Sequence, residues 1–236
     1  KSDHTASWVL VDGYPFRADW QRHVGAQTPL VAIDDLASFQ QVADVVVNQN
    51  IGFEATRYRF ATGHHGRILV GAPFVLLRSE LRAAPASRST AQPRRVLVTF
   101  GGADFGGWTQ PVAEALLQQL PRDVGVDVLL GPGATASTAA ALEAHAQAET
   151  RLSLHRSLAA VAPWMDGATL AVCAAGSTCW ELLARGVVPI AVPLADNQRA
   201  VSQGLVTHDA GVVVGWHADI DAAALANAAA TMLGNL

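Results

Sequence analysis

The sequence predicts an α/β protein made of two Rossmann-type, doubly wound parallel-sheet domains, the first of them incomplete. Short apolar runs rich in β-branched residues recur along the chain, as in strands that are buried on both faces of a parallel sheet. From residue 96 onward these runs alternate with helical patterns, which parallel crossovers require. The chain has 236 residues, more than one typical domain, and 50% of them are hydrophobic, enough for a sizeable core.

The first domain is assigned to residues 1–82. One helix is expected near residues 16–24. Strands are expected at 8–11, 30–33, 45–47 and 68–70. The chain begins with Lys1 and reaches a strand pattern almost at once, so we expect part of this domain to precede residue 1.

Residues 83–95 are predicted to be a linker. Their sequence, AAPASRSTAQPRR, has no large apolar side chain and carries two prolines and three arginines. Such a segment contributes nothing to a hydrophobic core. The domain boundary is therefore placed here.

The second domain is assigned to residues 96–236 and is expected to be complete. Its strands are expected at 96–100, 126–130, 152–154, 170–174, 188–192 and 212–214. Its helices are expected at 109–120, 135–148, 158–164, 178–184, 198–209 and 219–233. Six strands separated by helices predict one doubly wound parallel sheet.

Composition excludes several functional classes. The formal net charge is −4 and there is no run of Lys or Arg, which argues against nucleic acid or an anionic membrane as partner. No apolar stretch reaches the 18 or so residues that span a bilayer. Cys173 and Cys179 form no CxxC motif, which argues against a zinc site or disulfide scaffold. We expect a cytoplasmic monomer with no cofactor and no metal.

Ligands of open parallel sheets sit beyond the carboxyl ends of the strands, and the turns there carry the candidate site residues. The first turn has the sequence FGGAD. Gly101 and Gly102 would let the backbone approach a ligand closely, and the helix that starts at Thr109 would favour an anion such as a diphosphate. The alternative is a tight turn in which Asp104 bonds its own backbone. The turn has neither a dinucleotide nor a Walker motif.

The second turn has the sequence AAGSTCWE and again follows a strand. After Gly176, Ser177 and Thr178 would offer donors to a phosphate, while Glu181 would accept bonds from a vicinal diol such as ribose. The spacing of Thr178 and Glu181 also fits a capping box, which leaves both interpretations open.

A third polar segment, Asp196-Asn197-Gln198, follows the next strand. It suits sugar hydroxyls and amides, and it also suits the cap of the following helix.

These motifs, in this order, resemble known enzymes. FGGAD followed by AAGSTCWELLARGVVPIAVPLADNQ resembles the C-terminal half of GT-B-type nucleotide-sugar enzymes. VLVDGYPFRADWQ, VAIDDLA, VVVNQN and ILVGAPFVLLRSEL resemble the UDP-2,4-diacetamido-2,4,6-trideoxy-β-L-altropyranose hydrolases of pseudaminic acid biosynthesis. The resemblance covers residues 8–215. It implies a GT-B-like fold, a UDP-sugar substrate, and metal-independent attack of water at the anomeric carbon with inversion.

The resemblance also implies roles for residues of the second domain. Its turns would hold the diphosphate and phosphate through Gly101, Gly102, Asp104, Gly176, Ser177 and Thr178. Glu181 would bind the ribose, and Asn197 and Gln198 would reach the sugar. The segment 155–158, with Arg156, would line the uracil pocket.

In the first domain, the resemblance makes Tyr14 a catalytic residue near the attacking water. Asp34 and Asp35 match a pair of the family, although Asp35 is also placed to cap a following helix, which is the interpretation we favour. The family's catalytic base is a histidine in an N-terminal glycine-rich loop that this chain lacks. His64 and His65, in TGHHGR, are expected to be surface residues, so the base is expected to lie outside this chain.

Two other classes of function remain open. A GT-B glycosyltransferase would pass the sugar to an acceptor hydroxyl instead of water. A non-catalytic module would bind a nucleotide sugar through the second domain alone. A nucleotide-sugar 2-epimerase of the same architecture is a weaker alternative. Fold class alone does not decide between them.

Overall fold

The computed structural model describes residues 6–85 and 94–235, which form two compact units, Lys1–Leu76 and Leu77–Leu236. The units divide a few residues before the predicted end of the first domain at residue 82. Residues 77–85 pack within the second unit, where Leu81 is 2% exposed. Most of the predicted linker, residues 86–93, lies outside the described residues.

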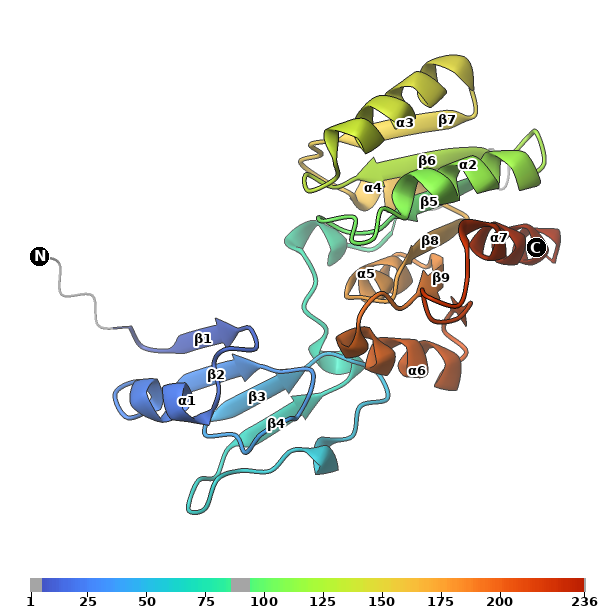
Figure 1. Ribbon diagram of the computed structural model, residues 1–236. Helices are drawn as coiled ribbons and strands as arrows, with labels where there is room; N and C mark the ends of the chain where they lie inside the picture. Colours follow the sequence, from blue (N-terminus) through green and yellow to red (C-terminus); the bar gives the residue numbers. More distant parts are fainter. Residues whose placement is uncertain (1–5, 86–93, 236) are drawn as a thin grey trace, which may run out of the picture. The chain divides into compact units, whose positions relative to one another are not determined.

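The first unit is a parallel sheet of four strands in the order β1-β2-β3-β4 (Figure 1). The strands are β1 (Val9–Asp12), β2 (Leu30–Ile33), β3 (Val45–Asn48) and β4 (Arg67–Val70). Its helical segments are α1 (Ala18–Gly25), η1 (Ala55–Arg57) and η2 (Ala72–Phe74). All four predicted strands and the predicted helix are confirmed to within two residues.

The second unit is a parallel sheet of six strands in the order β10-β9-β8-β5-β6-β7. The strands are β5 (Arg95–Thr99), β6 (Gly125–Leu130), β7 (Leu152–Arg156), β8 (Leu170–Ala174), β9 (Val188–Val192) and β10 (Val212–Val213). The chain runs outward from β5 to one edge and then returns to continue from β8 to the other edge. This is the doubly wound Rossmann order, and its switch point lies between β5 and β8.

Helices cover both faces of the six-stranded sheet. The helical segments of this unit are η3 (Ser79–Leu81), α2 (Thr109–Gln119), α3 (Ala136–Ala148), α4 (Ala162–Gly167), α5 (Thr178–Ala184), η4 (Asp196–Gln198), α6 (Arg199–Thr207) and α7 (Ala222–Gly234). α2 packs on α3 and α7 over the core face, and α4 and α5 pack on β5, β8 and β9 (Figure 1). Thr135 and Asp221 cap α3 and α7, because each side chain accepts a backbone N–H of the first turn.

The main core lies between the sheet and the layer of α2 and α7. Alternate residues of each strand point to this side, and they are almost entirely Val, Leu and Ile, for example Val96, Val98, Val126 and Val128, all fully buried. The opposite face contains the polar Asp127, which is 4% exposed. The face of the sheet toward α2 and α7 is therefore apolar, whereas the opposite face also carries polar side chains.

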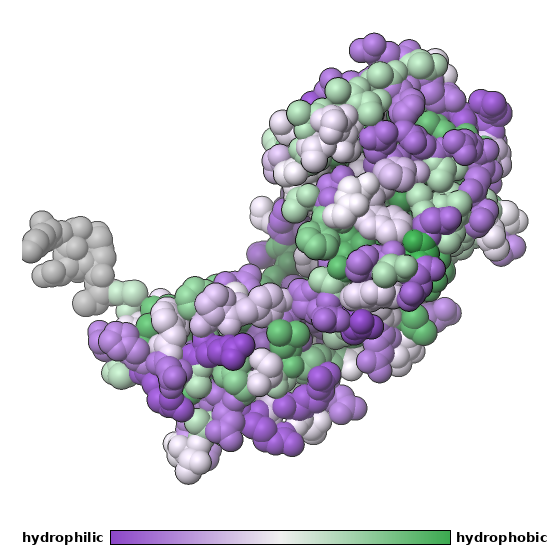
Figure 2. Space-filling model, viewed as in Figure 1, coloured by the Kyte–Doolittle hydropathy of each residue, from purple (hydrophilic) through white to green (hydrophobic). Residues whose placement is uncertain are grey.

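Neither the surface hydropathy nor the two cysteines indicate a particular function. Figure 2 shows hydrophilic and hydrophobic residues mixed over the visible face of each unit. Among the residues that the structure describes, no helix is both long and apolar enough to cross a membrane. Cys173 and Cys179 are free, buried thiols whose Sγ atoms lie 3.7 Å apart.

Candidate functional site

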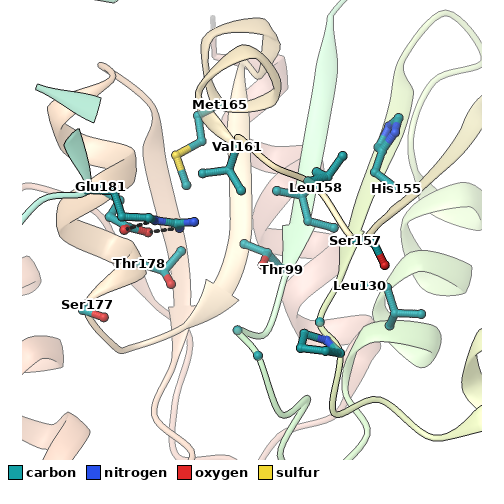
Figure 3. Close-up of a pocket in the computed structure, with 16 residues that line it drawn as sticks. Thr99, Leu130, His155, Ser157, Leu158, Val161, Met165, Ser177, Thr178 and Glu181 are labelled. Carbon is teal, nitrogen blue, oxygen red and sulfur yellow. Dashed lines mark hydrogen bonds and ion pairs between the residues drawn. The ribbon is translucent and has the colours of Figure 1, made fainter. Parts of the chain in front are cut away.

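The candidate site is a cavity of about 410 Å³ at the carboxyl ends of the strands of the second unit (Figure 3). Its lining comes from the last residues of β5, β6 and β7, from the segments after β5, β6, β7 and β8, and from α4, α5 and residue 78. The lining residues are Arg78, Thr99, Gly101, Gly102, Leu129, Leu130, Gly131, Pro132, His155, Ser157, Leu158, Val161, Met165, Ser177, Thr178 and Glu181. The cavity therefore lies at the switch point of the sheet, where open α/β sheets bind ligands.

The glycine turn after β5 forms one side of the cavity. Gly101 has a φ of +74°, which glycine adopts without strain. A Cβ placed on either Gly101 or Gly102 would meet no atom within 4 Å, so the turn leaves open space beside its backbone. This is the arrangement that a close approach of backbone to ligand requires.

Asp104 is buried beneath this turn. Its Oδ1 accepts bonds from the backbone N–H and the hydroxyl of Thr109, at 3.1 and 2.7 Å. Asp104 itself has a φ of +44°. The carboxylate thus links the turn to the start of α2. This structural role is close to the alternative that the sequence left open, a turn in which Asp104 bonds the local backbone. Asp104 does not line the cavity.

A second glycine turn, after β6, was not singled out from the sequence. The N–H of Gly133 donates to the carbonyl of Gly102 at 2.7 Å, and a Cβ on Gly131 would lie 2.2 Å from the carbonyl oxygen of Gly101. The two turns therefore touch through their backbones. The GPG motif directly after the strand VDVLL was the available signal.

The turn after β8 brings Ser177 and Thr178 to the cavity. Figure 3 shows both side chains on the same side as Glu181, with Leu158, His155 and Ser157 on the other side. The predicted capping box is not formed, since Ser177 is the N-cap residue of α5 and no side chain caps it. The hydroxyls and the glycine turn can supply hydrogen bonds to a phosphate.

Glu181 forms an ion pair that the sequence did not predict. Its side chain is 11% exposed, and its two oxygens accept bonds from Nε and an Nη of Arg78, each at 2.8 Å. The Glu181 carboxylate raises the pKa of Arg78. A carboxylate held in this way has further lone pairs with which to accept hydroxyls.

His155, which lines the cavity, belongs to a polar cluster at the sheet. His155 stacks on Trp164 with the ring centroids 3.6 Å apart, and its Nε2 lies 3.0 Å from Oδ1 of Asp127. Asp127 also accepts bonds from the guanidinium of Arg95, whose pKa it raises. Leu158, together with apolar residues of α4, completes a wall suited to a flat ring.

The structure brings five of the predicted binding residues to the cavity, namely Gly101, Gly102, Ser177, Thr178 and Glu181. The remaining predicted residues of this unit do not line it. Arg156 pairs instead with Glu143 of α3. Gln198 lies near Gly176, and its Oε1 accepts the N–H of Leu194 at 2.8 Å. Asn197 is in η4, beside Gln198.

The first unit has a polar cluster of its own at the carboxyl ends of its strands. Tyr14 follows β1 and donates to Oδ2 of Asp35, after β2, at 3.2 Å. Burial raises the pKa of both Asp34 and Asp35. Asp34 accepts a bond from Gln41, and its carbonyl accepts the hydroxyl of Tyr58.

The expectation that Asp35 caps a helix is wrong. β2 is followed by an irregular segment, in which Asp34 accepts the N–H of Leu36 and Ala37 has a φ of +52°. These local bonds compete with helix formation. His65 is exposed, whereas His64 is half-buried and its Nε2 lies 3.0 Å from the carbonyl oxygen of Ala43.

Together, the two parallel sheets and their order define the GT-B-like class of Rossmann-type proteins, and the comparison with solved structures shows the same fold. The chain is similar to MurG of Acinetobacter baumannii, with a TM-score of 0.62 and 19% identity over 96% of this chain and 65% of that one. It is also similar to a putative UDP-N-acetylglucosamine 2-epimerase of Listeria monocytogenes, with a TM-score of 0.64 and 13% identity over 97% of this chain and 66% of the other.

A third similar structure was solved with a nucleotide. It is UGT89C1 of Arabidopsis thaliana complexed with UDP, with a TM-score of 0.62 and 15% identity over 98% of this chain and 64% of that one. The chain thus spans just under two thirds of the length of MurG and of UGT89C1. No protein-family model and no curated protein sequence matches the chain.

In the described part of the chain, no three His, Cys, Asp or Glu side chains gather as a metal site would need. The polar groups that line the cavity are hydroxyls, backbone groups, the guanidinium of Arg78, the imidazole of His155 and the carboxylate of Glu181. Such groups can neutralise and orient a diphosphate through hydrogen bonds.

Proposed function

We propose that the second unit binds the UDP part of a nucleotide sugar. The observation that carries this proposal is the meeting of two separate turns at one cavity, with Gly101 and Gly102 on one side and Ser177, Thr178 and Glu181 on the other. The glycine turn and the hydroxyls would hold the diphosphate. Glu181 would accept the ribose hydroxyls, and the wall at His155 would receive the uracil. Similar folds that bind UDP, such as UGT89C1, support the choice of nucleotide.

We further propose that the whole enzyme is a UDP-sugar hydrolase. The motif resemblance supports UDP-2,4-diacetamido-2,4,6-trideoxy-β-L-altropyranose as substrate, cleaved at the anomeric carbon to UDP and free sugar. UDP is a good leaving group, so such an enzyme needs a base to orient water and donors to hold the developing diphosphate charge. Tyr14, paired with Asp35, is proposed to contact the water.

Glycosyl transfer to an acceptor hydroxyl is the second candidate. It is favoured by the similarity of the fold to MurG and to UGT89C1. The two candidates share the UDP site and differ in what attacks the sugar. We propose that the catalytic base of either reaction is supplied from outside the residues present here.

Proton NMR of the purified chain with this UDP-sugar tests the proposal. Broadening of the nucleotide signals without release of sugar is the result expected for a binding fragment of the hydrolase. Release of free sugar would place the base within this chain and contradict that part of the proposal. The absence of both broadening and release would contradict UDP-sugar binding itself.

A further inference from the structure

Residues 77–85 form hydrogen bonds with both α4 and α5 beside the cavity. Arg78, at the start of this segment, makes the ion pair with Glu181 of α5. Two residues later, the carboxylate of Glu80 accepts the backbone N–H of Val161 at 3.1 Å, at the beginning of α4. The segment thus bonds to both helices that flank the switch point.

Further contacts fix the segment in place. Leu81 is 2% exposed, and the carbonyl of Ala83 accepts an Nη of Arg185 at 2.6 Å. Arg185 in turn makes two bonds of 2.6 Å with Asp166 of α4. Arg78 therefore projects from a backbone that is anchored by an apolar contact and by ion-paired side chains.

The Glu181 carboxylate depends on this anchoring. Its side chain is 11% exposed, and a carboxylate at such a depth is costly unless a cation pairs with it. The two parallel bonds from Arg78 fix both the position and the plane of the carboxylate, since a guanidinium is a rigid planar donor. Each oxygen keeps a lone pair for a second donor.

Arg78 itself is less constrained by burial. Its side chain is 51% exposed, so its removal empties little space in the protein interior. Removal affects Glu181 most, because Glu181 loses two bonds of 2.8 Å and its fixed orientation, whereas Glu80 loses a contact of 3.9 Å with the guanidinium. The two residues therefore differ in burial: Arg78 is half-exposed and Glu181 is nearly buried. We expect Arg78 to contribute more to the position of the Glu181 carboxylate than to the stability of the fold.

Building on the proposed function, we propose that Arg78 is a positioning residue for diol recognition. It acts through Glu181, whose carboxylate it holds oriented so that both oxygens accept the two vicinal hydroxyls of the ligand's ribose. On this basis the specificity for a ribonucleotide over its dideoxy analogue depends on a residue that touches neither hydroxyl.

Isothermal titration calorimetry with UDP and 2′,3′-dideoxy-UDP tests this role on the full chain. The parent should bind UDP about tenfold more tightly than the dideoxy analogue, the size expected for charge-assisted bonds to hydroxyls. Arg78→Ala should lose most of this ratio, by weakening UDP binding while leaving the affinity for dideoxy-UDP nearly unchanged. Arg78→Lys, which keeps one charge and loses the fork, should restore part of the ratio.

Arg82→Ala is the matched control, because Arg82 lies on the same segment and its Nε donates to the nearby carbonyl of Leu77. It should keep the parent ratio of the two affinities.

Equal losses of affinity for both ligands in Arg78→Ala would overturn the proposal and make Arg78 a diphosphate contact. A parent that binds UDP but does not discriminate between the ligands would overturn the role of the diol while leaving UDP binding intact. A parent that binds neither would overturn the proposed function itself.

Discussion

The backbone N–H of Gly133 donates to the carbonyl of Gly102 across 2.7 Å, which joins the turn after β6 to the turn after β5. Gly102 of this bond lines the cavity, as does Gly131 in the second turn. Gly133 could not be replaced without consequence for the turn after β5, because a Cβ on Gly133 would lie 2.9 Å from that same carbonyl oxygen. The shape of the candidate site therefore rests on backbone contact between two strand ends.

Gly131→Ala should lower both stability and UDP affinity. Its Cβ would lie 2.2 Å from the carbonyl oxygen of Gly101, so one of the two turns must move. Overpacking of this kind typically costs about 1–3 kcal/mol. Thermal unfolding and calorimetry measure the two effects. Gly167→Ala, where a Cβ would meet no atom within 4 Å, is the control and should leave UDP affinity unchanged.

Gly102→Ala should separate binding from stability. The added methyl group meets no protein atom within 4 Å and extends into the space beside the turn. The variant should therefore unfold at nearly the parent temperature, while its affinity for UDP falls by about tenfold, or 1.4 kcal/mol. Parent-like affinity would show that the diphosphate does not approach this turn.

Glu181→Ala should weaken UDP binding about tenfold or more, as expected when a charge-assisted hydrogen bond of roughly 1.5–3 kcal/mol is lost. Calorimetry with UDP gives the affinity, and circular dichroism checks the fold. Glu143→Ala provides the matched control, because Glu143 is a half-exposed carboxylate that also pairs with an arginine. Unchanged affinity in a folded Glu181→Ala variant would limit Glu181 to its structural pairing with Arg78.

Asp35→Asn should alter how the stability of the first unit depends on pH. Burial raises the pKa of Asp35 in the folded state, so folding favours its protonated form. Its contribution to stability is therefore greatest below its unfolded pKa of about 3.9 and declines as pH rises through the folded pKa. Asparagine stays neutral and can still accept the Tyr14 hydroxyl, so this decline should vanish.

Urea unfolding across that pH range, followed by the indole NMR signal of Trp20, measures this effect. Trp20 packs on Phe16 in the first unit, with ring centroids 4.6 Å apart. Asp19→Asn is the control, since the Asp19 side chain is 98% exposed. An identical pH dependence in parent and Asp35→Asn would contradict the assigned effect of burial.

Local sequence pattern was sufficient for most of the fold. The strands at 170–174 and 188–192 and the helix at 178–184 were predicted with the observed bounds, because β-branched runs and polar turns mark them directly. The helix expected at 158–164 begins later, at Ala162, where Pro163 fits the first turn.

The site was predictable only in part. Gly101 and Ser177 could be found, because turns after parallel strands converge at one edge of the sheet. The pairing of Arg78 with Glu181 could not, since 103 residues separate them and only tertiary packing brings them together. The charged Asp127 on a fully buried strand carries no local signal of its Arg95 and His155 partners either.

Binding of UDP in the cavity of the second unit is tested most directly by titrating the ¹⁵N-labelled chain with UDP and recording two-dimensional NMR spectra. Such binding predicts saturable shifts that are largest at the amides of Gly101, Gly102, Ser177 and Thr178. Absence of shifts at millimolar UDP, or shifts confined to residues away from this cavity, would contradict it.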